Sequence, residues 1–229
     1  MNLRKTVASL SVALLVAGSG GIVAAQDEPT PGVLGNPVTH ECVTELGTSE
    51  VPENVTGYII TSEESLATFS VTEELAGQGV TEAIGTTNAV IGTLLVDNDG
   101  NPLACSRIDV DLRTLVTDES RRDARMLDAL NVDGNPVSTF IVTEITDLDG
   151  SLEDGVQTEL TLVGNLTING IEKQVSWDAT VTHQDGSISG NASTTVRFDD
   201  FEVSKPVMGP VMSIDDEVTI TMDIVAVAQ

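Results

Sequence analysis

The sequence predicts an all-β fold, an antiparallel barrel of eight strands with one short helix. Apolar and polar residues alternate in several segments, with the period of a strand that buries one face. Turn dipeptides containing Gly separate these segments, and several span eleven to thirteen residues, longer than the usual five or six of a sandwich strand. A two-sheet sandwich stays the alternative. Eight strands close a barrel that can hold one small ligand.

The N-terminus has the features of a secretory signal peptide over residues 1–25. Arg4 and Lys5 precede an apolar run over residues 7–16, and small residues lead up to Ala25. The run is shorter than the roughly 20 residues of a membrane-spanning helix, so we expect cleavage and no stable membrane insertion afterwards. The protein is therefore expected to be exported, to the periplasm or the extracellular space.

Two further regions follow the signal peptide. Residues 26–56 are expected to form an irregular N-terminal extension, because prolines recur there among Gly, Thr and acidic residues. Strand patterning begins at Tyr58, so residues 58–229 are expected to form a single barrel domain.

The barrel strands are placed by alternation. Val175, Trp177, Ala179 and Val181 share one face of their segment, and Ile108, Val110 and Leu112 alternate with Asp109, Asp111 and Arg113 in another, so each strand is expected to bury one side only. The eight expected strands are 66–75, 88–97, 105–115, 137–147, 156–168, 172–183, 187–198 and 217–228.

Connections between the strands also carry local signals. Asn169-Gly170 and Asp185-Gly186 suit tight hairpins whose central residues need positive φ, which predicts consecutive antiparallel neighbours. A helix is expected over residues 121–130, because Asp118-Glu119-Ser120 can cap it and Met126, Leu127 and Leu130 have helical spacing.

Charge and cysteine content restrict the partners. The chain has 10 Lys and Arg against 36 Asp and Glu, and cleavage after Ala25 would leave 8 against 36, a net charge of −28. Such a chain is expected to avoid nucleic acid and anionic headgroups. Cys42 and Cys105 are the two cysteines, and in an exported protein we expect a disulfide between them, with two unpaired thiols as the alternative.

The sequence offers little that points to catalysis. It has no Gly-rich phosphate loop or nucleophile elbow, and no set of about four ligands for a zinc ion, so no cofactor and no metal are expected. His183 beside Asp185 is the best acid-base candidate, and we interpret it instead as a solvated turn histidine. An enzyme acting on a lipid stays a third-ranked alternative.

Inward positions are mostly Val, Ile, Leu, Ala and Gly, which can leave an apolar tunnel unfilled. A tightly packed aliphatic core is the alternative. Arg122 and Arg125 belong to a basic cluster on the expected helix, and they either bind an anionic headgroup such as a diphosphate or tie the helix to neighbouring strands.

The order of several motifs resembles the YceI-like, polyisoprenoid-binding family of extended lipocalin-like barrels. The matching stretches are residues 65–71, 106–112, 122–127, 135–140, 163–175 and 197–201 and the closing strand from Glu217. The first expected strand departs from the pattern, since Glu63-Glu64 and Thr72-Glu73 stand where relatives often show histidines flanking the Phe.

The resemblance implies a hydrophobic pore that accommodates an isoprenoid chain. We therefore expect an exported, non-catalytic protein that carries or sequesters a long isoprenoid lipid of the quinone or polyprenyl phosphate type, with a ligand-free structural or interaction barrel of the cell envelope as the alternative. A homodimer is left open. The candidate ligand-binding residues are Phe69, Leu112, Leu127, Phe140, Trp177 and Phe198.

Overall fold

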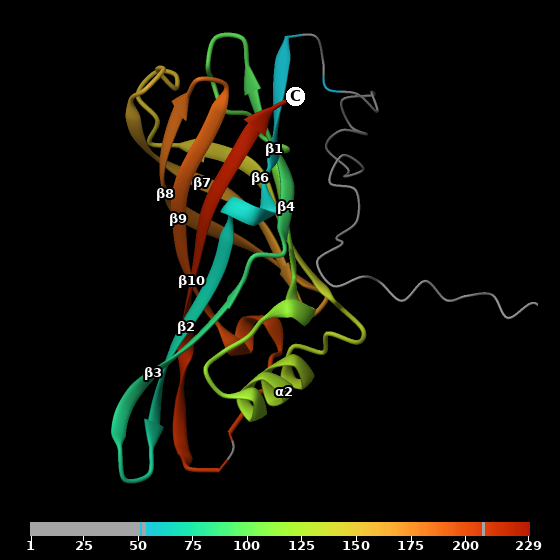
Figure 1. Cartoon of the computed structure of the whole chain (residues 1–229), viewed down its shortest axis with the longest axis vertical. Helices are drawn as coiled ribbons and strands as arrows, with labels where there is room; N and C mark the ends of the chain where they lie inside the picture. The colour runs from blue at the N-terminus through green and yellow to red at the C-terminus, as the bar shows by residue number, and fades with distance from the viewer. Residues whose placement is uncertain (1–50, 52–53, 208) are drawn as a thin grey trace, which may run out of the picture.

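The computed structural model describes Val51 and residues 54–207 and 209–229 (Figure 1). The expected signal peptide, most of the expected extension and Cys42 lie outside the described residues. The strands are β1 (Val55–Ile60), β2 (Leu66–Leu75), β3 (Gly79–Thr87), β4 (Val90–Asp97), β5 (Arg107–Asp111), β6 (Val137–Thr146), β7 (Gln157–Ile168), β8 (Ile171–Gln184), β9 (Ser187–Arg197) and β10 (Val211–Ala228). One α-helix, α2 (Ser120–Ala129), and short 3-10 helices that include η3 (Leu112–Thr114) and η4 (Phe198–Phe201) join them.

Eight of these strands form a closed antiparallel ring, as the sequence predicts. They follow the order β1-β4-β5-β6-β7-β8-β9-β10, and β10 pairs back with β1 to close the ring. The closure is short, because it runs over three residue pairs from Tyr58 to Ile60. Alternation along β8 is confirmed, since Trp177 and Ala179 are buried while Ser176 and Asp178 are exposed.

The remaining two strands extend the barrel at one end. β2 continues from β1 and pairs with the first part of β10, and β3 pairs with β2 in a hairpin. β10 therefore serves both regions: its last residues close the ring, and its residues 211–223 support β2. In Figure 1 this hairpin descends below the barrel on one side, and α2 lies on the other side.

Tight turns fix the register of the long hairpins. Asn169 and Gly170 have φ values of 51° and 73° between β7 and β8, and Asp185 and Gly186 have 50° and 74° between β8 and β9. Positive φ at both central residues is the requirement of the turns predicted for these dipeptides.

The expected boundaries hold in most places, and the differences have physical reasons. The segment expected at 66–75 coincides with β2, and the helix begins one residue earlier than expected. β1, which begins at Val55 inside the region assigned to the extension, was not expected as a strand, and it occupies the place in the ring that was expected for the strand at 66–75. β3 was not expected either. The sequence pattern does not predict β3, because it is an edge strand with few buried residues and therefore has no apolar face.

The prediction that every strand buries one side only is wrong for β5. Asp109 and Asp111 are buried as fully as the apolar residues of the strand, Ile108 and Val110. Their charges are compensated, because the Asp109 carboxylate accepts hydrogen bonds from Arg107 Nε at 2.8 Å and from Thr139 Oγ1 at 2.6 Å. Asp111 accepts from Arg113 Nη2 at 2.7 Å, so arginine side chains cover the outer face of this strand.

Candidate ligand-binding cavity

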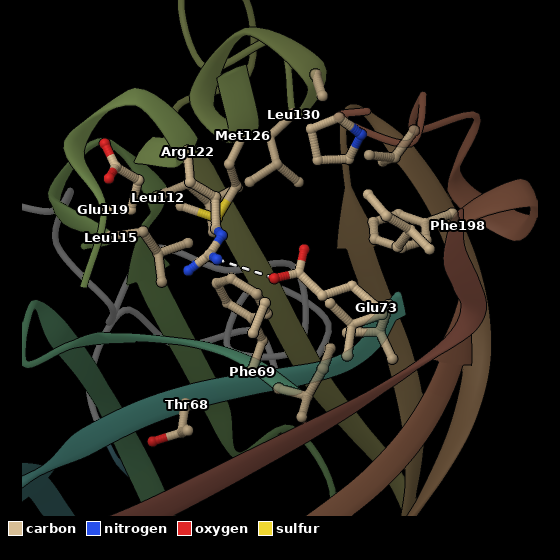
Figure 2. Close-up of a pocket in the computed structure, with 18 of the residues that line it drawn as sticks. Thr68, Phe69, Glu73, Leu112, Leu115, Glu119, Arg122, Met126, Leu130 and Phe198 are labelled. Atoms are coloured by element: carbon tan, nitrogen blue, oxygen red, sulfur yellow. Dashed lines mark hydrogen bonds and ion pairs between the residues drawn. The ribbon is translucent and has the colours of Figure 1, made fainter. Parts of the chain in front are cut away.

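A cavity of about 480 Å³ opens at the end of the barrel that carries the hairpin. Its walls come from β2 and β10 on one side, from α2 and η3 on another, and from η4 and the segment that follows it (Figure 2). Most of the side chains that line it are apolar. The barrel interior is therefore neither an open tunnel throughout nor packed solid, since one end contains this space.

Strand alternation builds the β2 wall. Ala67, Phe69, Val71, Glu73 and Leu75, every second residue of the strand, line the cavity. Gly85 of β3 lies beneath the Phe69 ring, and a side chain added there would collide with the ring atoms Cε1 and Cζ. The glycine therefore gives the phenyl ring the room it occupies beside the cavity.

The helix side is held by few contacts. Met126 is the one buried residue of α2, while Ala129 and the following Leu130 are half-buried and also line the cavity. Glu119 caps the helix by accepting a hydrogen bond from the Arg121 backbone N–H at 3.2 Å. The capped helix thus covers the cavity with one narrow apolar face.

A second, smaller cavity of about 60 Å³ lies deeper in the barrel. Phe140 and Trp177 line it, and their rings pack together with centroids 5.5 Å apart and an interplanar angle of 52°. Met222 lines both cavities, so its side chain stands at the boundary between them.

One ion pair crosses the lining of the larger cavity. Arg122 Nη2 of α2 lies 2.9 Å from Glu73 Oε1 of β2, and the side chains are 19% and 3% exposed. Arg122 Nη1 also donates to Asp118 Oδ1, in the segment just before the helix. Figure 2 shows the guanidinium group reaching from the helix to the Glu73 carboxylate over the Phe69 ring.

The structure divides the predicted ligand-binding residues into three groups. Phe69, Leu112 and Phe198 line the larger cavity. Phe140 and Trp177 do not, because they lie deeper and fill the barrel around the small cavity. Leu127 lines neither cavity and is a partly buried side chain that packs against the core.

The two predicted headgroup arginines also separate. Arg122 lines the larger cavity, whereas Arg125 is exposed and does not. Of the two alternatives weighed for the cluster, the structure shows the tie between helix and strand, since Arg122 joins α2 to β2, while headgroup binding stays a prediction. Cys105 has a φ of 72° in the segment before β5, and its expected pairing with Cys42 stays a prediction because Cys42 lies outside the described residues.

Glu73 is the lining residue that the sequence prediction missed as a site residue. Its signal was present: it falls in the same alternating register as Phe69 and Val71, so an acid at this position had to face inward. An acidic residue on the apolar face of a strand is worth singling out, because a buried carboxylate needs a partner.

The interpretation of His183 as a solvated turn residue is wrong. His183 lies within β8, and its Nε2 is 2.8 Å from the Tyr58 hydroxyl inside the ring of strands. Its Nδ1 is 3.9 Å from Asp154 Oδ1. Burial raises the pKa of Tyr58, so the phenol stays protonated and can donate this hydrogen bond. His183 lines neither cavity.

Within the described residues, no cluster of three or more His, Cys, Asp or Glu side chains is arranged to hold a metal ion. None of the helices described has the length and the hydropathy of a membrane-spanning segment.

The closed ring, the hairpin extension and the apolar cavity together define a ligand-cavity β-barrel of extended lipocalin-like type. Residues 58–226 match the YceI-like domain, and the chain belongs to this family.

The comparisons with individual proteins agree with this assignment. A UPF0312 protein of Pectobacterium atrosepticum is 32% identical over 149 residues, which are 61% of this chain and 71% of that protein. The solved polyisoprenoid binding domain from Saccharophagus degradans, described as implicated in plant cell wall breakdown, has a TM-score of 0.61 at 14% identity and covers 75% of this chain and 98% of its own. Burkholderia cenocepacia BcnA has a TM-score of 0.58 at 17% identity, covering 73% and 99%. These two structures share the fold of this chain.

Proposed function

We propose that this protein binds a long-chain isoprenoid lipid, of the quinone or polyprenyl phosphate type, in the larger cavity and carries or sequesters it without catalysis. The observation that carries the proposal is the apolar cavity of about 480 Å³ between β2, β10 and α2. This volume falls within the roughly 300–1,000 Å³ typical of small-molecule sites.

The lining explains why an isoprenoid would enter. Each methylene that leaves water contributes about 0.8 kcal/mol, and a branched apolar tail would replace water against Val71, Leu115 and Met126. Ordering the chain costs part of this gain, so binding depends on several isoprene units being covered. The solved relative from Saccharophagus degradans is described as a polyisoprenoid binding domain, which supports the same class of ligand here.

We also propose that the protein acts outside the cytoplasm, in the periplasm or the extracellular space. The support is the charge and hydropathy pattern of residues 1–25. N-terminal sequencing of the protein recovered from its host would test this, with Gln26 as the expected first residue and an intact Met1 as the contradicting result.

Organic extraction of the purified protein, followed by mass spectrometry, tests the ligand. A stoichiometric isoprenoid lipid is expected. A matched pair of variants locates it: Ala129→Trp places a large ring in the cavity and should abolish lipid retention, whereas Ala124→Trp, exposed on the same helix, should leave it unchanged. If no lipid is extracted and apolar dyes are excluded, the protein is instead a ligand-free structural or interaction barrel.

A further inference from the structure

We propose that the pair formed by Glu73 and Arg122 makes the cavity select an isoprenoid with an uncharged oxygen headgroup, a hydroxyl or a carbonyl, over one with a phosphate. This inference rests on the proposed function and narrows the class of lipid. It begins from the position of the pair, which lies in the apolar lining with Glu73 only 3% exposed.

The guanidinium of Arg122 is already compensated. Among the described residues it binds two carboxylates, Glu73 at 2.9 Å and Asp118 in the segment just before the helix, and Glu73 has no other hydrogen-bond partner there. A phosphate that took the Arg122 charge from Glu73 would leave a carboxylate buried without its cation, and a phosphate bound to the remaining N–H groups would lie beside the Glu73 carboxylate as a second anion. Arg122 therefore cannot serve as a free anion receptor.

The other charged side chains of the lining do not change this balance. They are Asp118, Glu119, Arg121 and Arg197. Arg197 is held at 2.7 Å by Asp216. Glu73, Asp118 and Glu119 thus face the two remaining arginines, in a chain whose net charge is −26. A phosphate headgroup would meet a site with no surplus positive charge.

The same pair can satisfy an uncharged headgroup. A guanidinium has five N–H donors, and two of its nitrogens are used here toward carboxylates, which leaves N–H groups for a carbonyl or hydroxyl oxygen. The second oxygen of Glu73, Oε2, can accept from a hydroxyl. A donor and an acceptor side by side at an apolar wall suit an alcohol, a phenol or a quinone.

Binding of geranylgeraniol and geranylgeranyl phosphate, measured by equilibrium dialysis below their micellar concentrations, tests the inference. The unmodified protein should bind the alcohol about tenfold or more tightly than the phosphate, because the phosphate places a second negative charge beside Glu73. Glu73→Gln releases the Arg122 charge and should raise phosphate affinity while leaving alcohol affinity nearly unchanged. Glu74→Gln, exposed on the same strand, is the control and should change neither.

Arg122→Gln removes the positive charge of the pair, the reverse of Glu73→Gln. It should lower phosphate affinity below that of the unmodified protein. Thermal unfolding establishes that each variant is folded. The ratio of alcohol affinity to phosphate affinity in the unmodified protein tests the inference even if a variant does not fold. Equal or tighter binding of the phosphate, or an unchanged ratio in folded Glu73→Gln, would overturn the headgroup inference while isoprenoid binding stands. Failure of both lipids to bind would overturn the proposed function itself.

Discussion

The Phe140 ring of β6 packs on the Trp177 indole of β8 on the inner side of β7, with ring centroids 5.5 Å apart. Both residues are buried, and they line the smaller cavity. This contact sets the depth of the larger cavity, because a ligand that enters from the α2 end meets Met222 and then the two rings.

Phe140→Ala should enlarge the small cavity and lower the free energy of unfolding by about 3–5 kcal/mol, since a buried aromatic ring is lost and the rigid strands cannot close the space. Urea unfolding followed by the fluorescence of the single tryptophan measures it. Val227→Ala, on an exposed part of β10, is the control and should stay within about 0.5 kcal/mol. A loss below about 1 kcal/mol for Phe140→Ala would show that the ring does not fill the barrel.

Met222→Ala should join the two cavities, because this side chain lines both. The variant should lose about 2–5 kcal/mol of stability and gain affinity for longer isoprenoid chains relative to shorter ones. Chain-length series in the lipid-binding assay measure the second effect. Met212→Ala, exposed on the same strand, should change neither property. An unaltered chain-length preference in Met222→Ala would mean that the ligand does not reach this boundary.

Asp111→Asn should cost about 3 kcal/mol of stability, because it removes the charge that compensates Arg113 at a side chain with no exposed surface. The pKa of Arg113 is raised, mainly by the hydrogen bond to Asp111. Asp133→Asn, on an exposed loop, should have little effect. Chemical unfolding compares the two, and equal stabilities would contradict a role for Asp111 in covering β5.

The turn after β4 predicts a specific pH response. The pKa of Asp97 lies below its ordinary value, first because the Asn101 side-chain amide donates to it and also because backbone N–H groups do. A pKa lowered on folding gives a stabilising contribution that is present above the ordinary aspartate pKa and is lost as the pH falls through the folded-state pKa. Asn101→Ala should therefore raise the Asp97 pKa, as followed by NMR titration. Asn98→Ala should leave the Asp97 pKa unchanged. The same Asp97 pKa in both variants would contradict the role of the Asn101 amide in lowering it.

The sequence was sufficient for seven of the eight ring strands and for the tight turns, because those depend on local patterns, whereas the ring strand β1 was not predicted. Alternation along β8 and the positive φ of Asn169 and Gly170 each follow from a few neighbouring residues. β3 was missed because Val80 and Ile84 are exposed on an edge strand, so burial does not mark its pattern. The two buried acids of β5 were taken for a wet face because their arginine partners are not distinguishable from surface arginines in the sequence.

The sequence indicated which side chains face the barrel interior, but not which of them line the cavity and which fill the core. An inward aromatic residue lines a cavity or fills the core according to its height along the barrel. That height depends on strand register and on where α2 covers the end. Phe69 and Phe140 illustrate this, since the first lines the cavity and the second packs on Trp177. Glu73 could have been found by following its register in β2.

The 18-residue strand β10 is a rigid wall of the cavity. It is hydrogen-bonded to β9, β1 and β2, so displacing it would break the barrel and the hairpin together. The opposite wall is α2, which has Met126 as its one buried side chain and is joined to β2 by the pair of Arg122 and Glu73. We therefore expect the cavity to widen for a bulkier lipid by displacement of α2. The rates at which the proposed lipid binds and dissociates should then depend on how readily α2 moves.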